Sequence, residues 1–189
     1  MMHTALRFGI TFYSPFRVST GQAGRGIDAT VNRDNPLPGS SIKGVMRDAA
    51  RLVLRARPQL VAEVFGSESA ASPWVWSPAQ TENGMWTRTS VQTRVSIDED
   101  THTAVADRLV FAEIVEHPAA VFSIESIGSL PDARLAVHRV LLRASARAVH
   151  HVGAERRRGL GWVAITPLGD SGEAVPVSPE DLHLIRGGV

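Results

Sequence analysis

A single lysine lies in the first stretch of this sequence whose residue types could do chemistry. Lys43 is the only lysine among 20 lysines and arginines, and it lies in residues 37–44, which read LPGSSIKG. We predict that a helix begins here, capped by Ser40 or Ser41 after an extended segment. The first turn of a helix has free backbone N–H groups, and two hydroxyls and an ammonium lie beside them in this sequence. The junction is therefore suited to hold a phosphate group. An ordinary capped helix is the alternative.

Three consecutive arginines form a second candidate site far downstream. They lie in residues 153–161, which read GAERRRGLG, so glycines stand on both sides of them. Glycine lets a backbone approach a ligand closely, and the planar guanidinium of arginine suits a phosphate. A solvated loop is the alternative. The candidate RNA-binding residues here are Gly153, Arg156, Arg157, Arg158, Gly159 and Gly161. Two separate phosphate-type sites predict a protein that follows a nucleic-acid backbone.

The composition is that of an ordinary soluble protein. The 189 residues are 43% hydrophobic and 21% charged, which predicts one globular domain over residues 1–189. The absence of cysteine excludes disulfides and thiolate metal sites, and it fits a cytoplasmic protein. We find neither a signal peptide nor an apolar span of roughly 20 residues, so we expect no association with a membrane. Since the net charge is only +1, affinity for nucleic acid must come from local clusters of cations.

The N-terminal third of the chain predicts a strand, a long loop and a long helix. Apolar and polar residues alternate in residues 6–12, which indicates a half-buried strand. Residues 19–41 are rich in Gly, Asn, Asp and Pro, and a loop of this length is usually functional. The helix then runs to about Arg57, where Pro58 closes or kinks it. It carries a basic stripe, for which a solvated helix face is the alternative. The stripe consists of Lys43, Arg47, Arg51 and Arg55.

The remainder predicts an insertion, a hairpin and a second helix between strands. Residues 61–86 look irregular, and we expect their three tryptophans to pack the insertion onto the body rather than to stack on bases. Strand-like sequence at about 91–115, interrupted by polar residues at 98–103, predicts a long hairpin with a polar tip. Further predicted elements are a strand at 121–127, a helix at 132–151, a strand at 162–166 and a tail strand at 182–185.

The order of these elements is strand, helix, strands, strand, helix, strand. It predicts an α+β protein with the ferredoxin-like βαββαβ plan, extended by a long loop after the first strand and by the hairpin. Many RNA-binding modules of the RRM type share this plan. A fold alone does not decide a function, so the functional argument depends on the candidate sites.

Several of these segments resemble one known family. Residues 38–47, which read PGSSIKGVMR, resemble the "PGSSLKG…R" signature of the RAMP superfamily of CRISPR-associated proteins, and residues 153–161 resemble its C-terminal glycine-rich loop. Residues 94–113 are similar to the β-hairpin "thumb" of the repeated backbone subunit of type III effector complexes (Csm/Cmr type). Residues 26–28, which read GID, look like the loop of that subunit that carries a catalytic aspartate. The resemblance covers about residues 5–166.

The resemblance implies a guide-RNA-binding backbone subunit of a type III CRISPR interference complex, with a RAMP fold. It implies that Asp28 anchors Mg²⁺ or Mn²⁺ and promotes endonucleolytic cleavage of guide-paired target RNA through attack of the ribose 2′-hydroxyl. The thumb would separate guide and target, using Asp98, Thr101 and His102. The helix residues implied in guide binding are Ser40, Ser41, Lys43, Arg47 and Arg51. The implied partners are guide (CRISPR) RNA, target RNA, further copies of the chain and other type III subunits.

Other interpretations stay open at this point. Asp28 alone would be a turn residue, and Asp34 is either a supporting group or the salt-bridge partner of its neighbour Arg33. His150 and His151 could act as acid and base, although stabilisation at the end of a helix is the simpler explanation. The chain could be a nuclease-inactive structural RAMP subunit. It could also be an endonuclease that processes precursor guide RNA, or a metabolic enzyme that binds phosphate.

Overall fold

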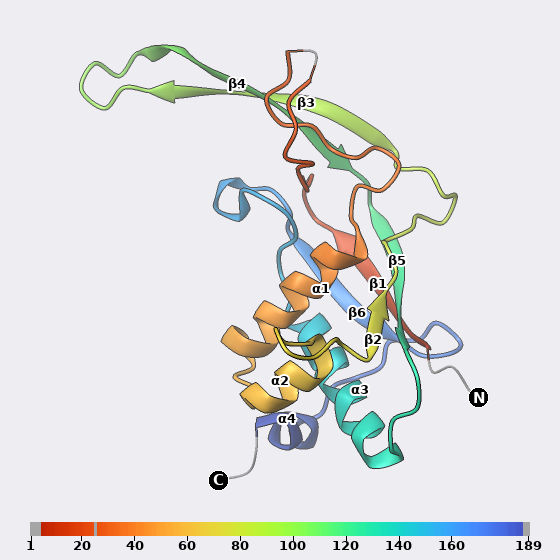
Figure 1. Ribbon diagram of the computed structural model, residues 1–189. Helices are drawn as coiled ribbons and strands as arrows, with labels where there is room; N and C mark the ends of the chain where they lie inside the picture. Colours follow the sequence, from red (N-terminus) through yellow and green to blue (C-terminus); the bar gives the residue numbers. More distant parts are fainter. Residues whose placement is uncertain (1–4, 25, 187–189) are drawn as a thin grey trace.

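A four-stranded antiparallel sheet lies at the centre of the molecule (Figure 1). The structure is a computed structural model, and it describes residues 5–24 and 26–186, without the side chains of residues 96 and 106–108. The spatial order of the strands is β2-β5-β1-β6. The strands are β1 (Ala5–Phe12), β2 (Trp74–Trp76), β5 (Ala119–Ser126) and β6 (Val163–Leu168). This order and the alternation of strands and helices confirm the predicted ferredoxin-like α+β fold.

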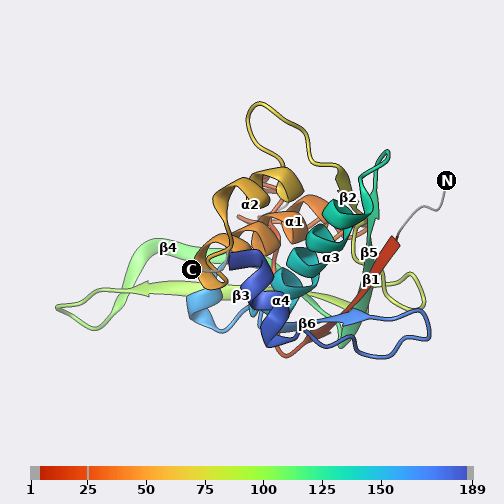
Figure 2. The same ribbon diagram turned by 90° about the horizontal axis from the view of Figure 1, so that it is seen from below.

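The helices pack on one face of this sheet (Figures 1 and 2). They are α1 (Gly39–Asp48), the π-helical turn η1 (Ala49–Val53), α2 (Pro58–Phe65), α3 (Asp132–Arg147) and α4 (Pro179–Arg186). Burial alternates along the strands, so that every second side chain of β1, from Leu6 to Phe12, enters the core. Phe8 of β1 stacks on Phe122 of β5, with the ring centroids 4.9 Å apart. Alternation of this length predicts a half-buried strand well, and β1 lies where the sequence placed it.

A long hairpin projects from the body as a separate two-stranded sheet (Figure 1). Its strands are β3 (Arg88–Ile97) and β4 (Ala104–Glu116), which agrees with the prediction of a hairpin at about 91–115 with its tip at 98–103. The long loop after β1 is attached to the base of this hairpin. Phe16 forms a bridge with Val115, and Ala29 forms a parallel bridge with Ala112. The hairpin is thus held by backbone pairing with a loop that is distant in sequence.

The predicted irregular insertion at 61–86 is wrong, because this segment supplies a strand of the central sheet. Trp74 and Trp76 pair with Ser126 and Ile124 of β5, and both tryptophans are buried. Since β2 and β5 are the second and third strands of the ferredoxin-like plan, it is the hairpin that is inserted between them. A strand of three residues is too short for its alternation to be recognised in a sequence. The expectation that the tryptophans pack onto the body is confirmed.

The predicted single helix that ends at about Arg57 is also wrong. α1 passes directly into the π-helical turn η1, which ends at Val53. After a short non-helical segment, Pro58 begins α2 instead of closing the first helix. Proline is well suited to the first position of a helix because its missing N–H has no partner there. The N-cap of α1 is Pro38, and neither Ser40 nor Ser41 forms a side-chain cap.

Two predictions for the C-terminal part are wrong, the strand at 182–185 and the end of the helix at residue 151. Residues 182–185 lie in the helix α4 and not in a strand. A reciprocal pair of hydrogen bonds between Ser178 and Asp181 starts this helix, which is the capping-box arrangement. α3 ends at Arg147, so His150 and His151 lie beyond the helix and not in its last turn. Among the described residues, no helix is both long and apolar enough to cross a bilayer.

Candidate nucleic-acid interface

The first predicted phosphate site is built where α1 meets the short strand β2. A Cβ atom on Gly39 would lie 2.2 Å from the Trp76 carbonyl oxygen, so only glycine fits at this position. Trp76 donates a hydrogen bond from Nε1 to Met46 Sδ at 3.4 Å, and the Lys43 ammonium lies over its ring, 5.2 Å from the centroid. Burial, and then the charge of Arg47, lower the pKa of Lys43. The lysine is thus positioned by a tryptophan that the sequence had assigned to an insertion.

A groove of about 830 Å³ runs beside this lysine, between α1 with η1 on one side and α2 on the other. Lys43, Arg47 and Arg51 line it, whereas Arg55, the last residue of the predicted stripe, is exposed outside it. Within the residues that the structure describes, no carboxylate forms a salt bridge with the three lining cations. They therefore present uncompensated positive charge. Ser40 and Ser41 lie in the first turn of α1, as the candidate site requires.

A second, smaller groove joins the two sites that the sequence had placed far apart. Its volume is about 170 Å³, and it is lined by residues of α1 and η1 together with His150, His151 and Arg156. Leu52 lines both grooves. Through Leu52, the groove of the helix cations adjoins the groove that contains Arg156, in which Asp48 is the one acid. We call the surface of these two grooves, from Lys43 to Arg156, the basic face.

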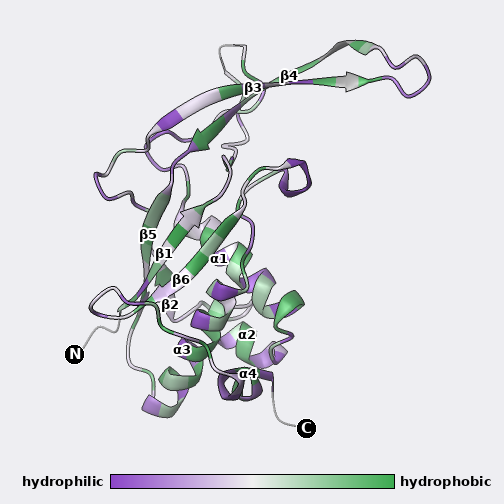
Figure 3. Ribbon diagram, turned by 180° about the vertical axis from the view of Figure 1, so that it is seen from behind, coloured by the Kyte–Doolittle hydropathy of each residue, from purple (hydrophilic) through white to green (hydrophobic). Residues whose placement is uncertain are grey.

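The arginine loop contains one exposed 3-10 turn, Arg156–Arg158, which is among the most hydrophilic parts of the molecule (Figure 3). Two of its glycines are required by the protein itself. A Cβ atom on Gly153 would lie 2.2 Å from the Arg17 carbonyl oxygen, and one on Gly161 would lie 2.0 Å from that of Val152. Close approach to a ligand is not needed to explain them. Gly159 has a φ of +81° and open space around it.

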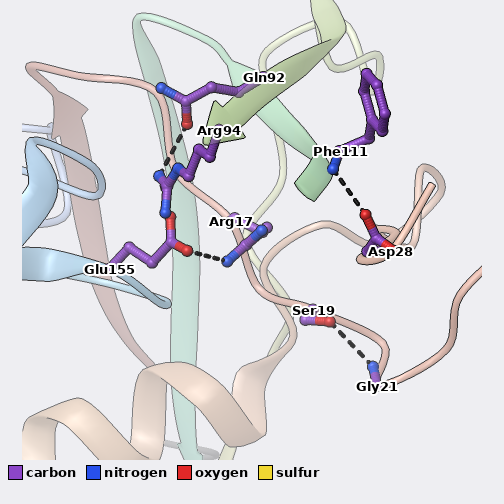
Figure 4. A network of polar contacts seen from close by, with 8 residues as sticks. All are labelled: Arg17, Ser19, Gly21, Asp28, Gln92, Arg94, Phe111 and Glu155. Atoms are coloured by element: carbon purple, nitrogen blue, oxygen red, sulfur yellow. Dashed lines mark hydrogen bonds and ion pairs between the residues drawn. The ribbon is translucent and has the colours of Figure 1, made fainter. Parts of the chain in front are cut away.

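Sequence reasoning missed an ion network that holds this loop (Figure 4). Arg17 donates from Nη2 to Glu155 Oε1 at 2.7 Å, and Arg94 of β3 pairs with the other carboxylate oxygen. Arg17 is 7% exposed. Glu155 has a φ of +64°, a left-handed conformation that is uncommon for a residue with a Cβ. The network connects the arginine loop, the segment after β1 and the hairpin strand β3. The single acid in an arginine run was the only sequence signal for it.

Asp28 lies against the hairpin strand β4 (Figure 4). Its Oδ2 accepts a hydrogen bond from the Phe111 backbone N–H at 2.8 Å, and its own N–H donates to the Phe111 carbonyl at the same distance. The side chain is exposed, and in the described part of the chain only Oδ2 accepts a hydrogen bond. Oδ1 can therefore bind a cation. The described residues hold no group of three or more His, Asp or Glu side chains suited to a metal, so phosphate or water oxygens must complete a cation's shell.

The neighbouring acid, Asp34, does not pair with Arg33. The Arg33 guanidinium instead donates from Nη2 to Glu113 Oε1 at 2.6 Å, and the Val31 N–H donates to Glu113 Oε2 at 3.0 Å. Burial opposes the ionisation of Glu113, but these two hydrogen bonds outweigh it and lower the pKa of its carboxyl. Asp34 is exposed, and its N–H donates to Asn32 Oδ1. The salt-bridge interpretation of Asp34 is therefore wrong.

The tip of the hairpin is acidic. Residues 98–103 read DEDTHT, so three carboxylates and no lysine or arginine lie there. Asp98 accepts hydrogen bonds from the Thr101 N–H at 2.8 Å and the Thr101 hydroxyl at 2.9 Å. These bonds, with one from the Asp100 N–H, lower the pKa of Asp98. His102 has a φ of +53°. A tip of this charge repels phosphate, so any separation of strands by it must be steric.

The two adjacent histidines lie at the arginine loop. The His151 ring packs against Trp162, with centroids 4.2 Å apart, and burial followed by the charge of Arg156 lowers the pKa of His151. Both histidines line the smaller groove. Because α3 ends before them, the dipole of this helix does not explain their position.

Comparisons with known proteins agree with the fold. A family model described as "RAMP superfamily" matches residues 10–164. One similar solved chain comes from a cryo-EM structure of the type III-B Cmr-beta complex bound to cognate target RNA. It is 12% identical with a TM-score of 0.67, and the match covers 86% of this chain and 96% of that one. A chain of the same complex in its apo state gives the same identity and TM-score, with coverage of 88% and 98%. No curated protein matches the sequence.

Proposed function

Because the chain belongs to the RAMP superfamily, we propose that it is a guide-RNA-binding backbone subunit of a type III CRISPR interference complex that cleaves guide-paired target RNA. The observation that carries this proposal is the basic face. It joins the signature helix to the arginine loop through two grooves that share Leu52. The projecting hairpin and Asp28 lie next to each other, as a subunit that handles two strands would need.

Guide binding would depend on phosphate contacts rather than on base recognition. Lys43, Arg47 and Arg51 supply free cations on one part of the basic face, and Arg156–Arg158 supply them on the other. Lys43 is partly desolvated and lies against the Trp76 ring. Burial disfavours its charged ammonium, and a bound phosphate would stabilise that charge again. Pairing between guide and target would then set the sequence choice. The neighbouring partners would be target RNA, further copies of this chain and other type III subunits.

Cleavage would take place beside Asp28. The hydrogen bonds to Phe111 attach Asp28 to β4, so the carboxylate stays at a fixed place relative to the hairpin. Oδ1, which accepts no hydrogen bond in the described part of the chain, would hold Mg²⁺ or Mn²⁺. Such a cation, held by the Asp28 carboxylate, would supply Lewis-acid stabilisation of the charge on the phosphate and on the leaving oxygen. The hairpin would distort the target so that the ribose 2′-hydroxyl comes into line with the scissile bond.

One observation favours a second candidate, a structural RAMP subunit without nuclease activity. The Asp28 carboxylate already accepts a backbone hydrogen bond, which is a sufficient structural reason for an acid at this position. The two functions differ in what removal of the Asp28 charge does to cleavage, because only a nuclease that uses Asp28 would need this charge.

Removal of Lys43 and Arg47 should weaken guide binding and reduce its dependence on salt. Each phosphate-binding cation that is removed should lower the slope of log affinity against log salt by about 0.7 to 1 for single-stranded RNA. The slope of the double alanine variant should therefore fall by roughly 1.4 to 2, measured by fluorescence anisotropy over a series of KCl concentrations. Arg55→Ala is the matched control, since Arg55 is exposed on the same segment outside the groove. An unchanged slope in the double variant would remove the helix from the RNA path.

Shortening the hairpin tip should affect the target and spare the guide. Replacing residues 98–104 with a tight turn removes the acidic tip and the pair between Ile97 and Ala104, but leaves the pairing of residues 88–95 with residues 109–116. Complexes of the protein with guide RNA should form normally. The cleavage products of a paired target should lose their regular spacing in length. Gel analysis of end-labelled target RNA and size-exclusion chromatography of the complexes give the two measurements. Loss of the complexes themselves would show that the tip is needed for assembly.

A further inference from the structure

The larger groove has an apolar floor in addition to its cations. Val61 and Phe65 of α2 form this floor, and each keeps only a small exposed fraction, 5% and 2%. Ala62 of the same helix also lines the groove. Leu52 lies at the rim and is 76% exposed. A site for a phosphate alone needs only donors and positive charge, so the apolar surface indicates a ligand with an uncharged part.

Two apolar side chains of the π-helical turn, Leu52 and Val53, are exposed. A continuous α-helix would place Val53 on the apolar face with Ile42 and Met46. In the structure, η1 inserts a wider i→i+5 turn, and Leu52 and Val53 point outward with exposed fractions of 76% and 55%. π-helical turns inside α-helices occur frequently at functional sites. This turn places an apolar side chain directly after the groove cation Arg51.

The charges around the groove define the other part of the ligand. Lys43, Arg47 and Arg51 lie on one side, and Glu68 is the single acid among the lining residues. The groove volume of about 830 Å³ is within the range of roughly 300–1,000 Å³ found for small-ligand pockets. An anion with a flat apolar portion fits this combination of charge and shape. A nucleotide has both parts.

Hydroxyl groups in the groove are already engaged. Ser72 donates to the Val64 carbonyl at 2.6 Å and accepts from the Trp74 N–H, and Ser67 pairs with Ser69. The Ser72 hydroxyl is therefore not free to read the edge of a base. The floor is apolar, and packing against an apolar surface does not depend on base identity. Binding at this site should accept any base.

We propose that this groove binds one nucleotide of the guide strand with its base turned inward, the phosphate on Lys43, Arg47 and Arg51 and the base against Leu52 and the α2 floor. The proposal rests on the proposed function, because it concerns the strand that the basic face would bind. It adds an interaction with the base that phosphate binding alone does not require. The expected contribution of such a base interaction is roughly 5- to 150-fold in affinity.

The first test compares two probes that differ only in their bases. A short uridine oligoribonucleotide and an abasic ribose-phosphate strand of the same length are titrated against the full chain. The ratio of the two affinities measures what the bases contribute. Ala62→Trp, which fills the groove, should lower this ratio at least about fivefold. Ala133→Trp, at an exposed position of α3 outside both grooves, should leave the ratio unchanged. Leu52→Ala should also lower this ratio. Because Leu52 is exposed, this substitution should not disturb folding.

The second test locates the base directly. Strands that carry 4-thiouridine are cross-linked to the native protein and the attached peptides are identified by mass spectrometry. Attachment within residues 52–72 supports the proposal. Cross-links elsewhere, together with an unchanged affinity ratio in both groove variants, would overturn it.

The remaining outcomes separate the rival explanations. If the Lys43 and Arg47 variant still loses RNA affinity while the ratio stays constant, the groove binds phosphate only and the proposed function stands. If the native chain binds neither probe, the proposed function itself fails. If Ala62→Trp instead breaks up oligomers of RNA-free protein in sedimentation experiments, a protein segment occupies the groove. The acidic hairpin tip of a second copy has the complementary charge for that case.

Discussion

Asp28→Ala should abolish cleavage of guide-paired target RNA and leave guide loading and target binding intact. The substitution removes the carboxylate that would hold the divalent cation, and the loss of rate should be on the order of 10²-fold or more. It also removes the hydrogen bond from the Phe111 N–H, at a cost of about 1 kcal/mol in stability. The Asp28 N–H would still donate to the Phe111 carbonyl, so the loop should stay in place. Gel analysis of a paired target and binding assays with both RNAs measure the two effects.

Asp28→Asn is the matched control for this experiment. Its side-chain oxygen can still accept from the Phe111 N–H, so the loop keeps its anchor while the negative charge is lost. Cleavage should collapse in this variant as well. EDTA should abolish cleavage by the native protein, and added Mg²⁺ or Mn²⁺ should restore it there and not in the variants. Full cleavage by the asparagine variant would identify Asp28 as a structural residue and the chain as a nuclease-inactive subunit.

Glu155→Ala should lower the stability of the protein far more than removal of an exposed arginine of the same loop does. The carboxylate compensates two arginines, Arg17 at 7% exposure and Arg94 with 16% of its side chain exposed. Removal of one partner of a buried pair leaves an uncompensated charge, which costs roughly 3–5 kcal/mol. Since 22% of the Glu155 side chain is exposed, we expect about 2–4 kcal/mol here. For a chain of this size the midpoint of thermal unfolding should fall by roughly 4–16 °C.

Two further variants separate the network from the rest of the loop. Arg157→Ala alters an exposed cation two residues away and should change the unfolding free energy by less than about 0.5 kcal/mol. A second substitution, Arg94→Ala, in the Glu155→Ala background removes one of the unpaired cations and should recover part of the lost stability. Thermal unfolding followed by circular dichroism gives all three values. Equal midpoints for Glu155→Ala and Arg157→Ala would show that the network contributes nothing.

The contrast between β1 and β2 shows why the fold could be predicted only in part. Alternation over residues 6–12 and over the two hairpin strands is long enough to indicate strands and their exposed faces. β2 has three residues, and its strand conformation comes from pairing with β5 about 50 residues later in the chain. The π-helical turn has no periodicity of its own to recognise. The capping box at Ser178, by contrast, was a local signal that the sequence analysis overlooked.

The sequence by itself indicated the candidate phosphate-binding residues, the plan of the fold and the position of the hairpin, because these depend on residue types and on local spacing. Only the tertiary structure decided how they are combined. Lys43 is positioned by Trp76, and Arg17 is paired with Glu155, which lies 138 residues away. The two candidate phosphate sites lie side by side because the segment directly after α3, residues 148–151, lies beside η1. Such arrangements depend on strand pairing and packing between distant segments, and no local pattern of side chains records them.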